Sequence, residues 1–182
     1  MKLMFASDIH GSAFYCRKML EAYQAEQAGR LILLGDILYH GPRNDLPKDY
    51  APKEVIAMLN PMREKICAVR GNCEAEVDQM VLDFPVMADY CIILEGDQTI
   101  YATHGHTYNE NNLPPLVEGD VLIHGHTHVL RAEKKEGYFL LNPGSVSIPK
   151  EGNPPTYGVL EDGLFSVKDF EGKIIRQIRL EP

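Results

Sequence analysis

Residues 3–11 read LMFASDIHG, a short apolar run that leads directly into an aspartate and a histidine. The run has the length and composition of a buried β-strand, and Asp8 and His10 follow its end. The same order recurs four more times, as LILLG before Asp36, CAVRG before Asn72, IYAT before His104, and VLIHG before His126 and His128. Ligands of open α/β sheets gather at the carboxyl ends of strands. The pattern therefore predicts that five strands deliver metal-ligand side chains to one edge of the fold.

The segments between these runs predict an α/β fold with strand–helix alternation first and hairpins later. A helix is expected from Ser12 as its N-cap to a stop at Gly29, and a second helix opens at Pro52. The polar stretch 39–50 indicates a functional loop. Further strands are expected at 90–95 and 98–103 as a hairpin, and at 121–123, 138–141, 156–161, 164–170 and 173–180. This order of elements predicts two packed sheets with helices outside.

Length and composition predict a single domain, residues 1–182. Hydrophobic residues make up 45% and charged residues 24%, as in soluble globular proteins, and one domain usually takes ~100–200 residues. No apolar run approaches the ~20 residues of a membrane helix, and the first residues do not resemble a signal peptide. The four cysteines show no CxxC spacing, which argues against a zinc knuckle or a thioredoxin-like pair. We therefore expect a cytoplasmic location and no membrane partner.

The net charge of −8 argues against a protein that holds nucleic acid mainly through its phosphates. Stable nucleic-acid binding is not expected, and a nuclease is less favoured because the chain has no basic arm or stacking stretch. The charge does not exclude a small phosphate-containing substrate, since bound metal supplies positive charge locally.

The polar residues at the strand ends are of the types that bind divalent transition metals. Carboxylate and amide oxygens and neutral imidazole suit Mn, Fe, Co and Zn. Six of the seven histidines, all but His40, lie in the segments DIHG, THGH and HGHTH. Any one segment could be an ordinary turn, but buried unpaired charge is costly, so packing alone does not explain this concentration. One aspartate can also bridge two ions ~3.5–4 Å apart, the spacing of two-metal hydrolytic sites.

These segments resemble the calcineurin-like metallophosphoesterase superfamily, through DIH at 8–10, GD at 35–36, GNCE at 71–74, THGH at 103–106 and GHTH at 125–128. A closer likeness to small bacterial YfcE-type phosphodiesterases extends to GDILYHGPRN at 35–44 and NPGSVSIPK at 142–150. The resemblance implies a four-layer α/β/β/α sandwich of two mixed β-sheets flanked by helices. It also implies two metal ions that share Asp36, the first held by Asp8, His10, Asp36 and His128, and the second by Asp36, Asn72, His104 and His126.

The implied activity is metal-dependent hydrolysis of a phosphodiester by a hydroxide that bridges two divalent ions. The ions outweigh the charges of Asp8, Asp36 and the hydroxide, so the loaded site carries about +1 and attracts a singly charged diester. Without metal the same site repels the substrate, which makes metal dependence a firm expectation. Mn is the first choice of metal, with Zn, Fe and Co as alternatives.

Cys73 stands where many superfamily members have a histidine, although YfcE-type proteins also have a cysteine there. A thiol with an ordinary pKa of ~8.5 is a poorer proton donor at neutral pH than an imidazolium. Diesters with good leaving groups should therefore turn over faster than alkyl diesters. Arg43 could clamp a phosphate through bidentate contacts. The candidate catalytic residues are Asn72, Cys73, His40 and His106, and the candidate substrate contacts are Arg43, His40 and Asn72.

Two other functions are compatible with the same sequence. One is a phosphomonoesterase or nucleotidase, which a comparison of nitrophenyl phosphate with its bis ester would separate. The other is a non-catalytic metal-containing interaction module, like the retromer subunit of the same superfamily fold. All seven expected ligands are present, which lowers this alternative without removing it. A homo-oligomer is also compatible, although no heptad or repeat argues for one.

Overall fold

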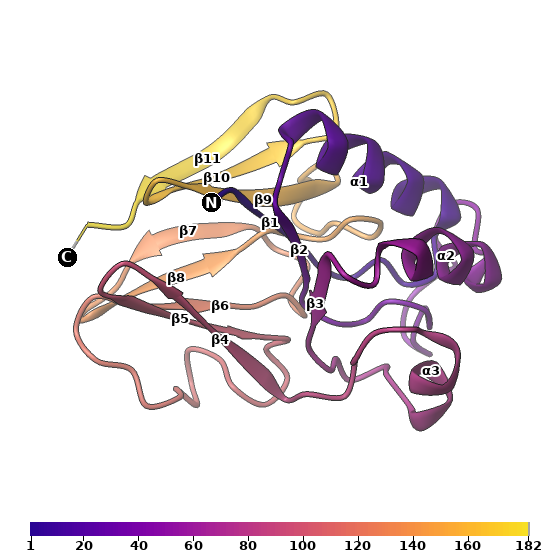
Figure 1. Cartoon of the computed structure of the whole chain (residues 1–182), viewed down its shortest axis with the longest axis horizontal. Helices are drawn as coiled ribbons and strands as arrows, with labels where there is room; N and C mark the ends of the chain where they lie inside the picture. The colour runs from indigo at the N-terminus through magenta and orange to yellow at the C-terminus, as the bar shows by residue number, and fades with distance from the viewer. Residues whose placement is uncertain (182) are drawn as a thin grey trace.

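The computed structural model describes residues 1–181 and contains two mixed β-sheets that pack face to face (Figure 1). In the first sheet a parallel unit of three strands continues into an antiparallel unit of three. From edge to edge it contains β11 (Ile174–Arg179), β10 (Leu164–Asp169), β9 (Thr156–Glu161), β1 (Leu3–Ala6), β2 (Arg30–Leu33) and β3 (Ile66–Ala68).

The second sheet has five strands, which are formed by residues 90–142. Its three central strands are parallel, and each edge strand is antiparallel to its neighbour. From edge to edge it contains β4 (Tyr90–Glu95), β5 (Gln98–Thr103), β6 (Asp120–Ile123), β8 (Tyr138–Asn142) and β7 (Arg131–Lys134). The hairpin expected at 90–103 is therefore present as β4 and β5.

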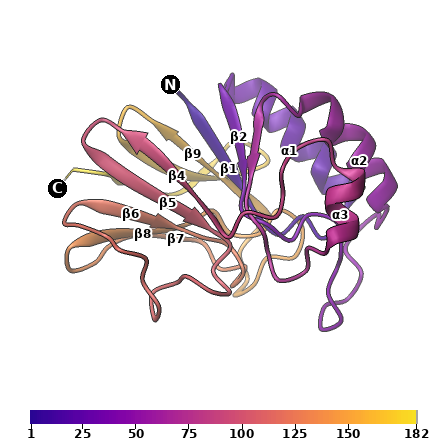
Figure 2. The same ribbon diagram turned by 60° about the horizontal axis from the view of Figure 1, so that its bottom comes forward.

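The described residues form three α-helices, and the first two pack on the outer side of the six-stranded sheet, as Figure 2 shows beside β1 and β2. The three helices are α1 (Ala13–Glu26), α2 (Pro52–Leu59), which is followed by a short 3₁₀ turn, and α3 (Glu76–Val81). Ser12 caps α1, because its hydroxyl accepts a hydrogen bond from the N–H of Tyr15, and Pro52 opens α2. No helix within residues 1–181 combines the length and hydropathy that crossing a bilayer requires.

Two apolar layers account for the burial of both faces of β1. Met4 and Ala6 pack with the helices, whereas Leu3 and Phe5 pack against the second sheet. Successive side chains of a strand point to opposite faces, so a strand between two layers must be apolar throughout. The expected fold of two mixed sheets flanked by helices is confirmed.

The outer face of the second sheet is covered by the connection 105–119. Tyr101 on β5 donates a hydrogen bond from its hydroxyl to the Pro115 carbonyl at 3.3 Å, and Leu122 and Leu140, whose strand neighbours face the other sheet, are fully buried.

The end of one helix and the presence of another differ from expectation. Helix α1 ends at Glu26 with Gln27 in the left-handed conformation (φ 53°), two residues before Gly29, whose N–H pairs with the Lys2 carbonyl instead. Helix α3 was not anticipated, because its six residues are too few to establish an apolar periodicity.

Candidate metal centre

The chain turns sharply directly after β1, β2 and β6, and these turns carry the expected ligands. Left-handed backbone conformations occur at five of the seven, namely Asp8 (φ 57°), His10 (φ 50°), Asp36 (φ 54°), His126 (φ 63°) and His128 (φ 61°). Such conformations cost about 1–3 kcal/mol each in residues other than glycine, and they cluster at functional sites. Neighbouring turns hold one another, since the N–H of His10 donates to the Asp36 carbonyl at 2.9 Å.

Two glycines allow these turns to approach closely. A Cβ on Gly71 would collide with the Asp36 carboxylate, and a Cβ on Gly125 would collide with the Ser7 hydroxyl and lie 2.8 Å from the Asp8 carboxylate. Only glycine fits where a backbone must pass this near to a ligand side chain.

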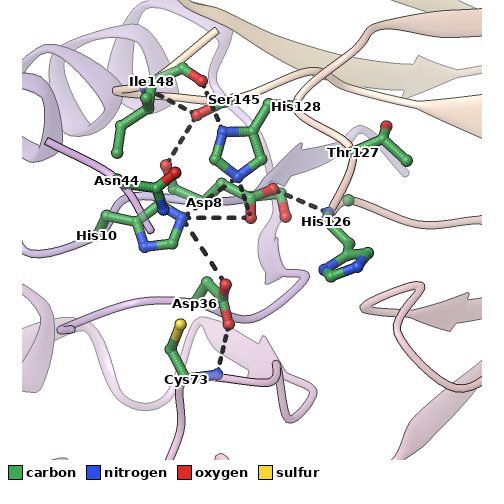
Figure 3. A network of polar contacts seen from close by, with 12 residues as sticks. Asp8, His10, Asp36, Asn44, Cys73, His126, Thr127, His128, Ser145 and Ile148 are labelled. Atoms are coloured by element: carbon green, nitrogen blue, oxygen red, sulfur yellow. Dashed lines mark hydrogen bonds and ion pairs between the residues drawn. The ribbon is translucent and has the colours of Figure 1, made fainter. Parts of the chain in front are cut away.

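The first group of ligand atoms surrounds the Asp8 carboxylate (Figure 3). Asp8 Oδ1 lies 3.2 Å from Nε2 of His128 and 3.6 Å from Nε2 of His10. The same His10 nitrogen lies 3.7 Å from Asp36 Oδ2 and 3.3 Å from the His128 nitrogen. Four side chains from two sheets thus direct their donor atoms at one small volume.

The second group lies on the other side of Asp36. Its Oδ1 is 3.5 Å from Nε2 of His104, which is 3.0 Å from Oδ1 of Asn72. The His126 ring centroid is 5.1 Å from that of His104, and the His126 N–H donates to Asp8 Oδ2 at 3.1 Å. Asp36 therefore contributes one carboxylate oxygen to each group.

The tautomers of three histidines follow from the hydrogen bonds that their Nδ1 atoms make. Nδ1 of His10, His104 and His128 lies 2.8, 2.6 and 2.6 Å from the carbonyls of Tyr39, Leu34 and Ile148 respectively. A carbonyl only accepts hydrogen bonds, so Nδ1 carries a proton and Nε2 of the neutral ring presents a lone pair. This arrangement is typical of metal-binding histidines, because the bonded Nδ1–H fixes the ring and strengthens Nε2 as a ligand.

Lone pairs that face carboxylates require a positive charge between them. Asp8 Oδ1 is buried and accepts no hydrogen bond, so it is an acceptor for which the described residues supply no donor. The alternative to a cation is protonation of the rings. Although burial opposes the charge, Asp36 and Asp8 raise the pKa of His104 to about 9. Burial likewise opposes ionisation of Asp8, but His10 and His128 hold the pKa of that carboxyl well below its usual range. The donor set therefore fits divalent metal ions.

A cleft of about 410 Å³ opens in front of these groups. Among the expected residues it is lined by Asp36, Arg43, Asn72, Cys73, His126 and His128. The other five lining residues were given no role by the sequence analysis, namely Gly41, Pro42, Asn44, Thr127 and Lys150. Lys150 is the last residue of the NPGSVSIPK segment. A basic residue in a segment that carries the family resemblance was an available signal for a substrate contact.

His40 and His106, two of the candidate catalytic residues, do not line the cleft. The His40 ring packs edge-on against Tyr39 and Tyr50, with centroids 4.8 and 5.3 Å apart. The His106 residue is exposed, and its ring centroid lies 5.4 Å from that of His104. His106 is thus the one whose ring packs beside an expected ligand, whereas the His40 ring packs between two tyrosines.

The segment 142–147 supports the ligand turns from behind and does not line the cleft. The hydroxyls of Ser145 and Ser147 both donate to the Asp8 carbonyl at 3.0 Å. The Asn142 amide donates to the Gly125 carbonyl at 2.9 Å and to the Thr127 hydroxyl at 3.1 Å. These contacts hold Asp8 and the turn before His126 in their strained conformations.

Comparison with known proteins agrees with this geometry. Residues 1–162 match the model of the calcineurin-like phosphoesterase superfamily domain. The chain is 49% identical to phosphodiesterase YfcE of Escherichia coli (strain K12) over 183 aligned residues, which cover 100% of both chains. A solved structure of Escherichia coli YfcE matches with a TM-score of 0.97 over 100% of both chains. A zinc complex of Vps29 from Entamoeba histolytica matches with a TM-score of 0.65 at 17% identity over 100% of both chains, which shows a shared fold alone. The chain therefore belongs to the calcineurin-like phosphoesterase superfamily.

Proposed function

We propose that the protein is a phosphodiesterase that hydrolyses small phosphodiesters with two divalent metal ions. The observation that carries this proposal is the convergence of imidazole Nε2 atoms and carboxylate oxygens, with Asp8 Oδ1 buried and unbonded. The full-length likeness to a protein named a phosphodiesterase supports the same reaction. Asp8, His10, Asp36 and His128 would hold one ion, and Asp36, Asn72, His104 and His126 the other.

When bound, the two ions lower the pKa of water and stabilise charge on the phosphoryl oxygens. The protein contributes the placement of its ligands. Asp36 offers Oδ1 on the side of His104 and Oδ2 on the side of His10, which suits a shared ligand. The mixture of oxygen and nitrogen donors suits Mn, Zn, Fe and Co, and we propose Mn as the first of these to test.

Two exposed cations would orient the substrate. Arg43 and Lys150 both line the cleft, and their positive charges can pair with phosphodiester oxygens that do not react. The cleft of about 410 Å³ suits a small diester. With a net charge of −8 on the chain, we propose that the protein does not bind nucleic acid stably.

The leaving group receives little help from strong acids. Burial and the charge of Asp36 raise the pKa of the Cys73 thiol, so it stays protonated and is a weak acid. Burial and the neighbouring His104 lower the pKa of His106, which leaves its ring mostly neutral at neutral pH. We propose His106 as the donor that serves poor leaving groups, and we expect turnover to be fastest for diesters whose leaving group needs no proton.

Two further parts of the proposal rest on other residues. All four cysteines are free thiols, which is usual for proteins of the reducing cytoplasm, and we propose that location. A homo-oligomer would need an exposed apolar surface, and the edge strand β4 offers Tyr90, Ile92 and Leu94.

The decisive experiment removes metal with a chelator and measures hydrolysis of bis(p-nitrophenyl) phosphate before and after addition of Mn²⁺, Zn²⁺, Fe²⁺ or Co²⁺. Activity should disappear with the metal and return with Mn²⁺. Asp36→Asn should lose at least about 100-fold of the activity, whereas Asp97→Asn, which changes an exposed carboxylate in the β4–β5 turn, should retain full activity.

Other outcomes would assign a different function. Full activity after chelation contradicts the metal mechanism. Faster hydrolysis of p-nitrophenyl phosphate than of its bis ester would identify a phosphomonoesterase. Uptake of metal without turnover of any ester would identify a non-catalytic interaction module.

A further inference from the structure

Glu74 places a buried carboxylate between the turns that follow β2 and β3. The residue is only 4% exposed, and its three hydrogen-bond donors are all backbone N–H groups. Oε2 accepts from Asp36 at 2.8 Å and from Gly71 at 2.5 Å, while Oε1 accepts from Ile37 at 2.7 Å. The carboxylate donates nothing, so these contacts suit its ionised form.

The two contacts with Asp36 and Ile37 fix the direction of the Asp36 side chain. Their N–H groups belong to the two peptide groups on either side of the Asp36 Cα. Holding both peptide groups fixes φ and ψ at this residue, which has the left-handed φ of 54°. The backbone conformation in turn determines where the Asp36 carboxylate points.

The third contact joins this turn to the one that carries Asn72. The Gly71 N–H binds Glu74, and the Cys73 N–H donates to Asp36 Oδ1 at 2.9 Å. The carboxylates of Glu74 and Asp36 thus tie the two turns together at the point where Gly71 allows their closest approach.

An ionised carboxylate is energetically unfavourable at the position of Glu74. Glu74 is buried beside Asp36, so desolvation and repulsion both oppose its charge. Bonds from N–H groups to a charged acceptor are roughly twice as strong as those between neutral groups, and they hold backbone more firmly. A nearby pair of divalent cations would also offset the added negative charge.

We propose that Glu74 is a positioning residue of the metal centre, which aims the shared ligand Asp36 and sets its distance from Asn72. This inference rests on the proposed two-metal function. Glu74 itself would touch neither metal nor substrate, because it belongs to none of the candidate ligand groups and does not line the cleft. Its loss should therefore weaken metal binding and leave the chemistry of the fully loaded enzyme largely intact.

The test compares Glu74→Gln with wild type and with a matched control. Asp120→Asn serves as the control, because Asp120 is also a buried carboxylate bonded to two backbone N–H groups, those of Thr99 and Val117, at the opposite end of β6. Mn²⁺ titration of the metal-depleted proteins measures affinity and stoichiometry. Electron paramagnetic resonance then shows whether the bound ions form a coupled pair, and thermal melting measures stability.

Glu74→Gln should bind Mn²⁺ about 10–100-fold more weakly, the range seen when groups that orient metal ligands are lost. Its hydrolysis of bis(p-nitrophenyl) phosphate should recover as the Mn²⁺ concentration is raised. Asp120→Asn should melt at a lower temperature and keep wild-type Mn²⁺ affinity.

Mn²⁺ affinity of Glu74→Gln within twofold of wild type, with an unchanged coupled spectrum, overturns the inference while the proposed function stands. Equal losses of Mn²⁺ affinity in Asp120→Asn and Glu74→Gln also overturn it, because they indicate a general effect of stability. Absence of Mn²⁺ binding by the wild type overturns the proposed function and this inference together. If Glu74→Gln does not fold, Glu74→Asp, which keeps the charge and shortens the reach, is measured against the same limits.

Discussion

Raising the pH above neutrality should destabilise the metal-free protein, because His104 then loses its positive charge. Nearby carboxylates stabilise that charge in the folded protein. In an unfolded chain this ring titrates near 6.5, whereas in the fold, despite burial, Asp36 and Asp8 raise its pKa to about 9. A raised pKa contributes stability that is complete below pH 6.5 and is lost as the pH rises through about 9. The difference corresponds to about 3 kcal/mol.

Other site histidines act outside this window or in the same direction. Burial and the charge of His104 lower the pKa of His126 to about 4, so this ring is already neutral in both states above pH 6.5. The pKa of His10 is raised by Asp8 against the effect of burial, and it adds to the loss. The carboxylates Asp8 and Asp36 have lowered pKa values and titrate only in acid.

Thermal melting at a series of pH values from 6 to 9.5, with chelator and with saturating Mn²⁺, measures this effect. For a chain of this size, about 3 kcal/mol corresponds to a fall of roughly 6–12 °C in the metal-free melting temperature. The Mn²⁺-loaded protein should show no such fall, since a neutral ring binds metal best. His104→Asn should remove most of the slope without metal. A metal-free melting temperature that is constant or rises across this range refutes the reasoning.

Four more predictions concern single side chains. Asp36→Asn should lower kcat/KM by at least about 100-fold and reduce the number of bound Mn²⁺ ions, as metal analysis would show. Cys73→His should accelerate alkyl diesters more than nitrophenyl diesters in parallel assays, and an equal loss on all substrates would contradict this. Arg43→Ala and Lys150→Ala should each raise KM by about threefold to tenfold, as expected for exposed charge contacts of ~1 kcal/mol, with little change in kcat. Ser147→Ala should cost about 1 kcal/mol in denaturant unfolding, because one of two donors to the Asp8 carbonyl is lost.

Much of the fold and of the candidate ligand set could be predicted because the end of each strand is visible in the sequence, where an apolar run gives way to polar residues. The apolar run before Asp8 is continuous since β1 is buried on both faces, and the strained turn after it places the proposed ligand. The hairpin of β4 and β5 was equally visible from its turn residues. In each case the signal lies within about ten neighbouring residues.

The remaining features depend on partners that are distant in the sequence. Glu74 binds the backbone of Ile37, and Ser145 binds the Asp8 carbonyl 137 residues away. Backbone partners leave no trace in side-chain patterns, so these particular contacts could not be predicted. His40 shows the converse, because its place in a loop rich in polar residues suggested chemistry while its ring packs against Tyr50.

Each proposed ion takes ligands from both β-sheets, and this has a consequence for assembly. The six-stranded sheet supplies Asp8, His10, Asp36 and Asn72, and the five-stranded sheet supplies His104, His126 and His128. Neither sheet supplies all the ligands of either proposed ion, so metal binding would require that the two sheets have packed together. The bound ions would then link the two sheets. Metal affinity should therefore report how well the two sheets pack together. A substitution in the core between the sheets, such as at Phe165, should lower activity although the residue lies away from the metal centre.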